Sequence, residues 1–226
     1  MILLKVKPMQ KLSLMLGTLV LLVCLLAGKQ AFAQADDLIQ AAEKGDLPRV
    51  KALLTAGADV NAKNDQGVTA LMMASEYGGL AVTQVLLANE AEVNAKGIAG
   101  ETALYLASAE DRFDVVKALL AKGSEVNAKT NDGTTALMIA SSYNSSPEVV
   151  QALLAKGAEV NAKTNYGTTA LMMASQNGYV KVVQALLAKG ADVNAKRNDG
   201  LTALVVATTR GYADVRDLLL RAGAKQ

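Results

Sequence analysis

The sequence predicts an all-α solenoid, in which about six short helix-turn-helix units stack in chain order and are joined by β-hairpin-like loops. Three observations lead to this fold class. The pair Val-Asn recurs every 33 or 34 residues, each period contains two short amphipathic helical patterns, and 51% of the 226 residues are hydrophobic although only 4% are aromatic. A fixed period of this length indicates stacked supersecondary units, and this share of apolar residues excludes wholesale disorder.

The first 33 residues differ from the rest and are predicted to be a secretory signal peptide cleaved after Ala33. A basic start is followed by an uncharged run over 12–27 and by the small-x-small sequence Ala31-Phe32-Ala33, which is the order of such a peptide. A membrane anchor is the less favoured alternative, because these 16 residues fall short of the ~20 that a spanning helix needs. A lipoprotein is also disfavoured, because Val23 stands before Cys24 where a small residue is expected.

Cleavage would change the charge of the chain and place it outside the cytoplasm. It removes four of the 23 basic residues and no acidic one, so 19 basic residues face 21 acidic ones. A balance of −2 carries no nucleic-acid footprint. We therefore expect a bacterial protein of the periplasm or of the secreted fraction, which contacts a membrane only transiently through its signal peptide.

Composition excludes much catalytic chemistry. The chain has no His and a single Cys. Imidazole acid–base catalysis, His-ligated metal sites and intramolecular disulfides are therefore excluded. We expect no cofactor, no metal site and no catalytic residue.

Residues 167–196 illustrate the repeating unit. Thr169 is a suitable N-cap for a helix that begins at Ala170, and Gly178 is expected to end it. A second helix carries its apolar face on Val182, Val183, Leu186 and Leu187, before Gly190 ends it. Each helix has only about ten residues, too few to be stable alone in water, so the units must stack to bury their apolar faces.

The sequence Thr69-Ala70-Leu71-Met72-Met73-Ala74 and its equivalents at Thr102, Thr135, Thr169 and Thr202 resemble the T-P-L-H-x-A signature of the ankyrin repeat family. The resemblance covers the predicted mature domain, 34–226, as six units of approximately 36–67, 68–100, 101–133, 134–167, 168–200 and 201–226.

The sequence departs from the family pattern at several positions. Met, Tyr or Val stands where the family has His, and we expect Met72, Met138 and Met172 to pack there. Glu90 takes the place of a helix-ending Gly, which predicts a less regular helix end. Arg49 and Arg216 each replace an apolar residue in the terminal units, which predicts charged, water-facing ends.

The resemblance implies a non-catalytic protein that binds another protein with its loop tips ("fingers") and the ends of its first helices ("palm"). Residues at these positions differ between units while the framework does not. The predicted contact residues are Glu76, Tyr77, Ile98, Glu110, Asn131, Asp132, Tyr143, Tyr166, Asn177, Asn198 and Arg210. Three of them are tyrosines, a residue type favoured in interface hot spots.

Two other patterns are interpreted as framework. A lysine column could attract an acidic partner, but an acidic column four residues earlier is expected to neutralise it in part. These columns are Lys63, Lys96, Lys129, Lys163 and Lys196, and Asp59, Glu92, Glu125, Glu159 and Asp192. The Met-rich runs are interpreted as packing residues rather than copper ligands.

The sequence thus predicts an interaction scaffold or adaptor that acts as a monomer. The alternative is a dedicated inhibitor, immunity factor or stabiliser of one enzyme in the same compartment. An enzyme is the third possibility, and it would need carboxylates, Lys or Tyr in a pocket.

Overall fold

The computed structural model describes residues 35–143 and 147–225, and within these two ranges the chain is helical with no extended strand. The expected β-hairpin-like loops appear in the described residues as two isolated antiparallel β-bridges, Lys63–Thr69 and Lys129–Thr135. The signal peptide expected over 1–33 and its cleavage site lie outside the described residues.

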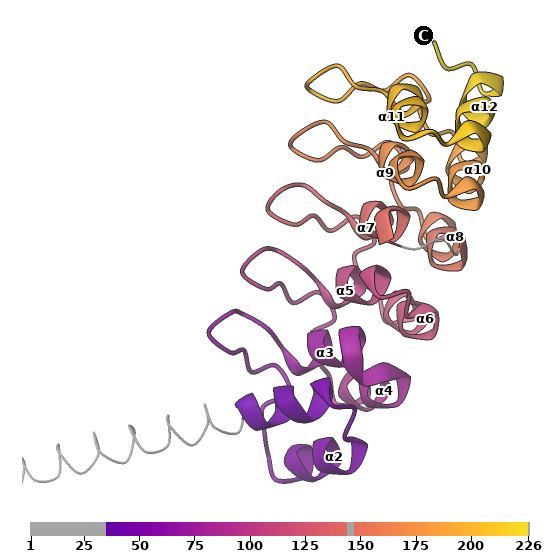
Figure 1. Cartoon of the computed structure of the whole chain (residues 1–226). Helices are drawn as coiled ribbons and strands as arrows, with labels where there is room; N and C mark the ends of the chain where they lie inside the picture. The colour runs from indigo at the N-terminus through magenta and orange to yellow at the C-terminus, as the bar shows by residue number, and fades with distance from the viewer. Residues whose placement is uncertain (1–34, 144–146, 226) are drawn as a thin grey trace, which may run out of the picture.

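Helices follow one another in pairs, each made of a first and a second helix (Figure 1). The first pair is a helix over 35–43 and α2 (Leu47–Thr55). The next consists of α3 (Ala70–Met73), the π-helical segment η1 (Ala74–Gly78) and α4 (Gly79–Ala88). The later pairs are α5 (Ala103–Ala109) with α6 (Phe113–Ala121), α7 (Ala136–Tyr143) with α8 (Pro147–Ala155), α9 (Ala170–Gln176) with α10 (Val180–Ala188), and α11 (Ala203–Arg210) with α12 (Ala213–Arg221).

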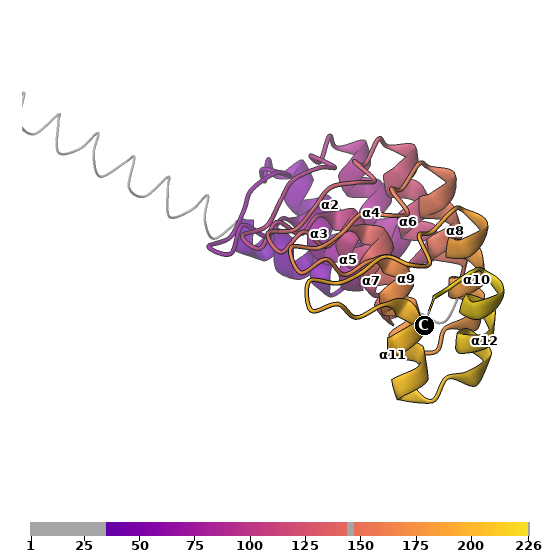
Figure 2. The same cartoon turned by 90° about the horizontal axis from the view of Figure 1, so that it is seen from above.

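The pairs stack in chain order into an elongated array. First helices pack on first helices, in the order α5, α7, α9 and α11, and second helices do the same in the order α4, α6, α8, α10 and α12. Loops project beyond the row of first helices (Figure 1). Seen from above, successive pairs are progressively displaced, so the array curves (Figure 2).

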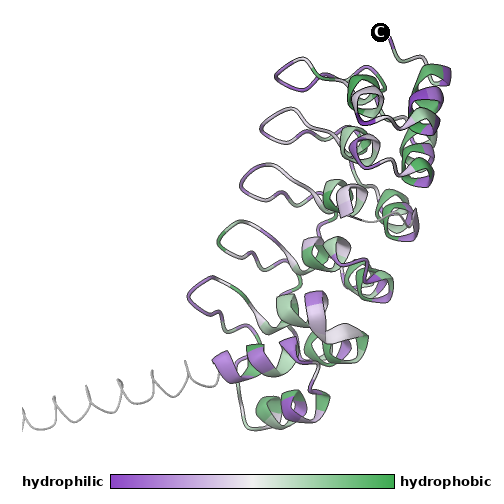
Figure 3. Ribbon diagram, viewed as in Figure 1, coloured by the Kyte–Doolittle hydropathy of each residue, from purple (hydrophilic) through white to green (hydrophobic). Residues whose placement is uncertain are grey.

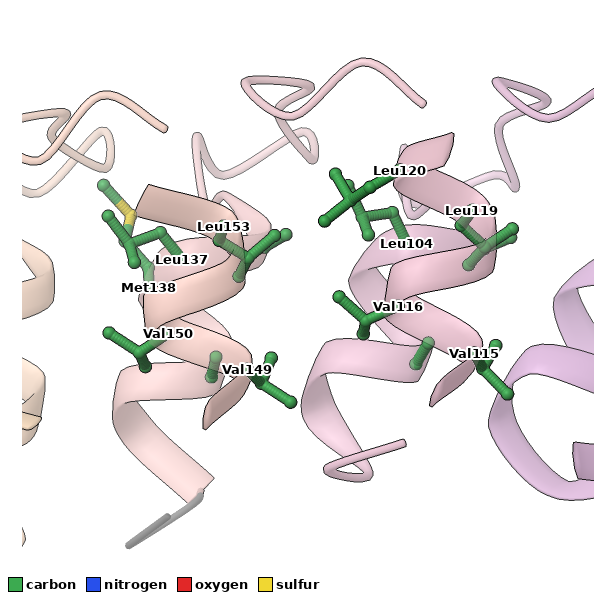
Figure 4. Packing of buried hydrophobic residues seen from close by; sticks show 14 of the residues in the cluster. Leu104, Val115, Val116, Leu119, Leu120, Leu137, Met138, Val149, Val150 and Leu153 are labelled. Atoms are coloured by element: carbon green, nitrogen blue, oxygen red, sulfur yellow. The ribbon is translucent and has the colours of Figure 1, made fainter. Parts of the chain in front are cut away.

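The core runs along the whole array between the two rows of helices. Apolar residues face inward and polar residues lie mainly on the loops and the outer faces (Figure 3). Within the α5–α6 pair, Leu104 lies beside Leu120 and near Val116, and within the α7–α8 pair Leu137 and Met138 lie near Val150 (Figure 4). Met72, Met138 and Met172 are all buried, which confirms the packing role expected for them.

The predicted start of the first helices is confirmed. The Thr169 hydroxyl accepts the Met172 N–H at 3.3 Å, and Thr69, Thr102, Thr135 and Thr202 cap their helices in the same way. This bond satisfies one of the orphan donors of each helix N-terminus. Pro147 begins α8, a first helical position at which the missing N–H of proline costs no helix bond.

The irregular end predicted after α4 is wrong. Glu90 adopts a φ of 63°, close to the 81° of Gly190. The same closing bond forms in both places, from Ala91 N–H to the Leu86 carbonyl at 3.1 Å and from Ala191 N–H to the Leu186 carbonyl at 3.0 Å. The helix end is therefore preserved, with a non-glycine residue held in the left-handed region.

The helical run Ala70–Ala88 is continuous, because η1 joins α3 directly to α4. By length and apolar composition these 19 residues could cross a membrane, but half of the run is buried inside the array. Packing against neighbouring helices accounts for its apolar character.

The two ends of the array are finished differently. Arg49 is exposed and its guanidinium lies 3.5 Å from the Asp37 carboxylate. Arg216 is partly buried and pairs with Asp217 at 2.7 Å, beside a hollow that it shares with Val205 and Leu220. Both arginines reach water as predicted, although the C-terminal end still exposes about 40% of Val205 and Leu220.

Candidate protein-binding surface

A column of asparagines, taken from the recurring Val-Asn pair, ties each helix pair to the next. The Asn127 side-chain oxygen accepts the Glu159 N–H at 2.8 Å, and its nitrogen donates to the Gly157 carbonyl at 3.2 Å. The same two bonds to the following unit are made by Asn61, Asn94, Asn161 and Asn194. These paired bonds fix the spacing of neighbouring units, which gives the most regular dipeptide of the sequence a structural role.

Five fingers (63–69, 96–102, 129–135, 163–169 and 196–202) project from this base, each closed by a backbone bond such as Thr164 N–H to the Thr168 carbonyl at 3.0 Å. Four of them are also braced by a side chain in the loop. The Asn64 oxygen accepts two backbone N–H groups, at Gln66 and Val68, both at 3.0 Å. The Thr164 hydroxyl does the same for Tyr166 and Thr168. The Thr130 hydroxyl accepts the Thr134 N–H, and Arg197 pairs with Asp199. Such Asx and Ser/Thr turns hold a loop in one conformation.

A second asparagine column runs across the fingers and includes two of the predicted contact residues. The Asn131 side-chain nitrogen donates to the Ile98 carbonyl at 2.9 Å. Asn165 donates to the Asn131 carbonyl and Asn198 to the Asn165 carbonyl, each at 3.0 Å. Asn131 and Asn198 are exposed, but each uses a side-chain N–H to hold its finger to the preceding one.

Two further predicted contact residues are engaged within the array. Asn177 is partly buried and its side-chain nitrogen donates to the Ser142 carbonyl at 2.9 Å and to the Met173 carbonyl at 3.1 Å, so it bridges α7 and α9. The Asp132 carboxylate accepts bonds from Thr130 and from the hydroxyl and N–H of Thr134. The bond from Thr130 is the main cause that lowers the pKa of Asp132, and the bonds from Thr134 add to it.

Four predicted contact residues present large apolar surfaces to solvent. Tyr143 is 68% exposed, Tyr166 67%, Ile98 66% and Tyr77 51%. Ile98 and Tyr166 lie on fingers, and Tyr77 and Tyr143 lie at the ends of first helices. Tyr179 and Tyr212, which are not among the predicted contact residues, are less exposed, and the Tyr179 hydroxyl donates to the Tyr143 carbonyl at 3.4 Å.

Charged residues of the palm differ along the array. The Glu76 carboxylate raises the pKa of Tyr77, chiefly as its hydrogen-bond partner and also through its charge, and Glu110 and Glu43 contribute from nearby. At the other end, Arg210 is exposed and lines a hollow with Gln176 and Arg197. The palm is therefore acidic around Tyr77 and basic around Arg210.

The acidic column was expected to neutralise the lysine column in part, but its side chains form no direct ion pair with those lysines among the described residues. The Lys63 ammonium donates instead to the Lys96 carbonyl at 3.1 Å, and that of Lys96 to the Lys129 carbonyl at 3.3 Å. Asp59 and Asp192 accept the N–H groups of Asn61 and Asn194. Across 35–143 and 147–225, no ion pair joins the two columns. In each column, two side chains therefore support loop backbone: Lys63 and Lys96, and Asp59 and Asp192.

The predicted contact residues did not include Glu101 and Tyr105, which line one hollow together with the predicted Asn131 and Asp132. A hollow of about 430 Å³ lies between the finger 96–102 and α5, with its walls on Ala99, Glu101, Tyr105, Leu106, Thr130, Asn131 and Asp132. Burial raises the pKa of Tyr105, and the nearby Asp132, Tyr143 and Glu101 add to the effect. Glu101 replaces the Val68, Thr134, Thr168 or Leu201 of the other fingers, and this difference between internal copies was the available signal.

In the described part of the chain, no group of three or more Asp, Glu, Cys or His residues is placed so that it could hold a metal ion. In the Met-rich runs, Met72 and Met172 are buried in the core, and Met73 and Met173 are partly buried against it.

A linear stack of helix pairs, joined by side-chain ladders and bearing variable loops on one edge, is a solenoid repeat protein. A sequence profile for ankyrin repeats (3 copies) matches residues 38–130 and again 137–226. The chain therefore belongs to the ankyrin repeat family.

A solved structure is also similar to it. A chain in the complex of the predatory endopeptidase Bd0816 from Bdellovibrio bacteriovorus with the immunity protein Bd3460 aligns with a TM-score of 0.75 and 33% sequence identity, over 82% of this chain and 97% of that one. No match was found among curated proteins.

Proposed function

We propose that the protein is a non-catalytic binding scaffold of six ankyrin units, exported by a signal peptide that is cleaved after Ala33, and that it recognises another protein with its fingers and palm. The observation that carries this proposal is the exposure of Tyr77, Ile98, Tyr143 and Tyr166 on one edge of the stack. Large exposed aromatic and aliphatic side chains on a framework are typical of binding surfaces. The fold alone would not establish this function.

Rigidity supports the proposal. The two asparagine columns hold neighbouring units and fingers at fixed spacings before any partner arrives. A surface that is already ordered loses less conformational entropy on binding, so modest contacts give useful affinity.

A second, narrower function is favoured by the similar solved structure: an immunity protein or inhibitor of an endopeptidase in the same exported compartment. The similar chain belongs to a complex between such an enzyme and an immunity protein, and it aligns over nearly its whole length. A rigid edge that covers the active-site cleft of a peptidase would block its substrates without any chemistry of its own.

Capture in the native host tests both functions. A tagged, exported protein is crosslinked in cells, and the captured proteins are identified and assayed. We expect one main partner, and Tyr77→Ala, Tyr143→Ala and Tyr166→Ala together should reduce its capture by at least about tenfold, since hot-spot residues each contribute about 1 kcal/mol or more. Gln84→Ala, Gln151→Ala and Gln184→Ala, on exposed positions of the second helices, are the matched control and should leave capture unchanged.

The outcomes separate the two functions. A captured peptidase that loses activity on titration with the purified protein supports the immunity function, and a captured protein without such loss supports the scaffold alone. Equal capture by the tyrosine variant and the wild type, with unchanged melting of both, would refute the assigned surface.

A further inference from the structure

The finger 96–102 departs from the other four at several positions, each of which gives up a framework contact. Gly97 stands where Asn64, Thr130, Thr164 or Arg197 occurs in the other fingers, so the loop has no bracing side chain at that position. Ile98 stands where Asn131, Asn165 and Asn198 make their bonds to the preceding finger. Its backbone N–H still reaches the Gln66 carbonyl at 3.1 Å, but no side-chain bond accompanies it.

The space freed by Gly97 is taken by Glu101. A Cβ atom at position 97 would lie 2.4 Å from Glu101 Oε1, so the carboxylate rests against the glycine. Glu101 Oε2 is buried and has no hydrogen-bond partner among the described residues. A buried carboxylate oxygen without a donor is unfavourable, and a binding partner that supplies the donor would remove that cost.

The surroundings of Glu101 define the chemistry of that donor. The Glu101 groove, as we name the hollow lined by Ala99, Glu101, Tyr105, Leu106, Thr130, Asn131 and Asp132, contains two carboxylates and no cationic residue. Among the described residues, no ion pair involves Glu101 or Asp132. Tyr105 and Leu106 add apolar walls along which the methylene groups of a long basic side chain can lie.

Ile98 adjoins the groove, because the groove residue Asn131 donates to its carbonyl. With two thirds of its surface exposed, it offers an aliphatic contact next to the acidic pocket. We propose that the Glu101 groove is the docking site for an arginine or lysine side chain of the protein partner, with an adjacent aliphatic residue of that partner packed on Ile98. This inference rests on the proposed binding function and names the part of the surface that confers specificity.

A defined peptide tests the groove without the natural partner. Acetyl-Leu-Arg-Leu-amide is titrated into the purified protein and followed by NMR, with the same peptide carrying citrulline in place of arginine as the uncharged probe. We expect saturable shifts confined to 97–101, Tyr105 and Asp132 with the arginine peptide and much weaker binding of the citrulline peptide. Charge-assisted hydrogen bonds are roughly twice as strong as neutral ones.

Matched variants then assign the effect to Glu101. Glu101→Gln should raise the Kd of the arginine peptide by about tenfold, which corresponds to the loss of one charge-assisted contact. Glu159→Gln, an exposed carboxylate outside the groove, the fingers and the palm, should leave the Kd unchanged. Ile98→Asn, which introduces the asparagine that three of the other four fingers have at this position, should weaken binding several-fold.

Three results would overturn the proposal: no saturable shift with the arginine peptide, equal binding of the citrulline peptide, or an equal effect of Glu159→Gln and Glu101→Gln. A preserved NMR spectrum of each variant shows that folding is not the cause. Peptide binding in the groove without capture of any protein from the host would leave the groove standing and refute the proposed function. Capture of a partner that is insensitive to Glu101→Gln would support the proposed binding function and refute the groove as the docking site.

Discussion

Two helix pairs of this protein begin with the same seven residues and end differently. Thr69–Ser75 and Thr169–Ser175 are identical in sequence. In both, the threonine caps the helix with a 3.3 Å bond, and the leucine that follows is 1% exposed. Beyond the serine, α9 stops at Gln176, whereas the other helix continues through the π-helical η1 into α4.

The difference arises from one glycine. Gly178 is left-handed, with a φ of 72°, and Tyr179 follows it, whereas Gly78 is right-handed and the positive φ falls on Gly79, at 78° with a ψ of 179°. This region is open to almost no residue except glycine. The second glycine therefore allows the turn to move by one residue, and a π-helical turn forms that carries the exposed Tyr77. Residues 70–73 and 170–173 are α-helical in both pairs, whereas Ala74 and Ser75 already belong to η1 although their equivalents belong to α9. The residue after the first glycine therefore decides where the turn falls.

The largest expected effect tests the shared part. Leu71→Ala and Leu171→Ala should each lower the free energy of unfolding by about 2–5 kcal/mol, as for other buried leucines. The two losses should agree closely because both side chains are buried to the same extent. Urea unfolding of the two variants measures this, and a much smaller loss for Leu71→Ala would show that the π-helical pair is packed less firmly.

An intermediate effect tests the part that differs. Gly79→Ala should cost about 1–3 kcal/mol, because alanine is strained at that φ and ψ although no atom lies within 4 Å of the added Cβ. Tyr179→Ala, at the corresponding position of the α9–α10 pair, introduces no such strain. A Gly79→Ala variant with unchanged stability would show that the turn moves back onto Gly78 without penalty.

The smallest effect concerns the second helix of each pair. Glu90→Gly should raise the free energy of unfolding by up to about 1 kcal/mol, because glycine relieves the left-handed strain but adds freedom to the unfolded chain. Gly190→Glu should lower it by a similar amount. Thermal melting of the two variants in opposite directions would confirm that the two helix ends have the same geometry.

The fold was predictable from the sequence to the level of caps and faces. Thr169, Gly190 and the buried Met172 have the roles that local pattern assigned to them. The outcome at Glu90 was not predictable, because the neighbouring helices impose a backbone conformation that the residue itself disfavours.

The candidate site was predictable only in outline. Exposure of Tyr77, Tyr143 and Tyr166 followed from their variable positions, but Asn131, Asn177 and Asn198 proved to hold neighbouring units together. Their partners lie 33 to 35 residues away, and no local pattern reveals whether an amide faces the solvent or the next loop.

By itself, the sequence determined the period, the helix caps, the apolar faces and the set of positions free to vary, because these depend on residues within a few turns of one another. Only the tertiary structure decided which of the variable side chains form hydrogen bonds between units and which remain free to contact a partner. The unpartnered oxygen of Glu101 belongs to the second group. The physical reason is that hydrogen bonds across a stack depend on the distance between neighbouring units, and that distance exists only once the units have packed.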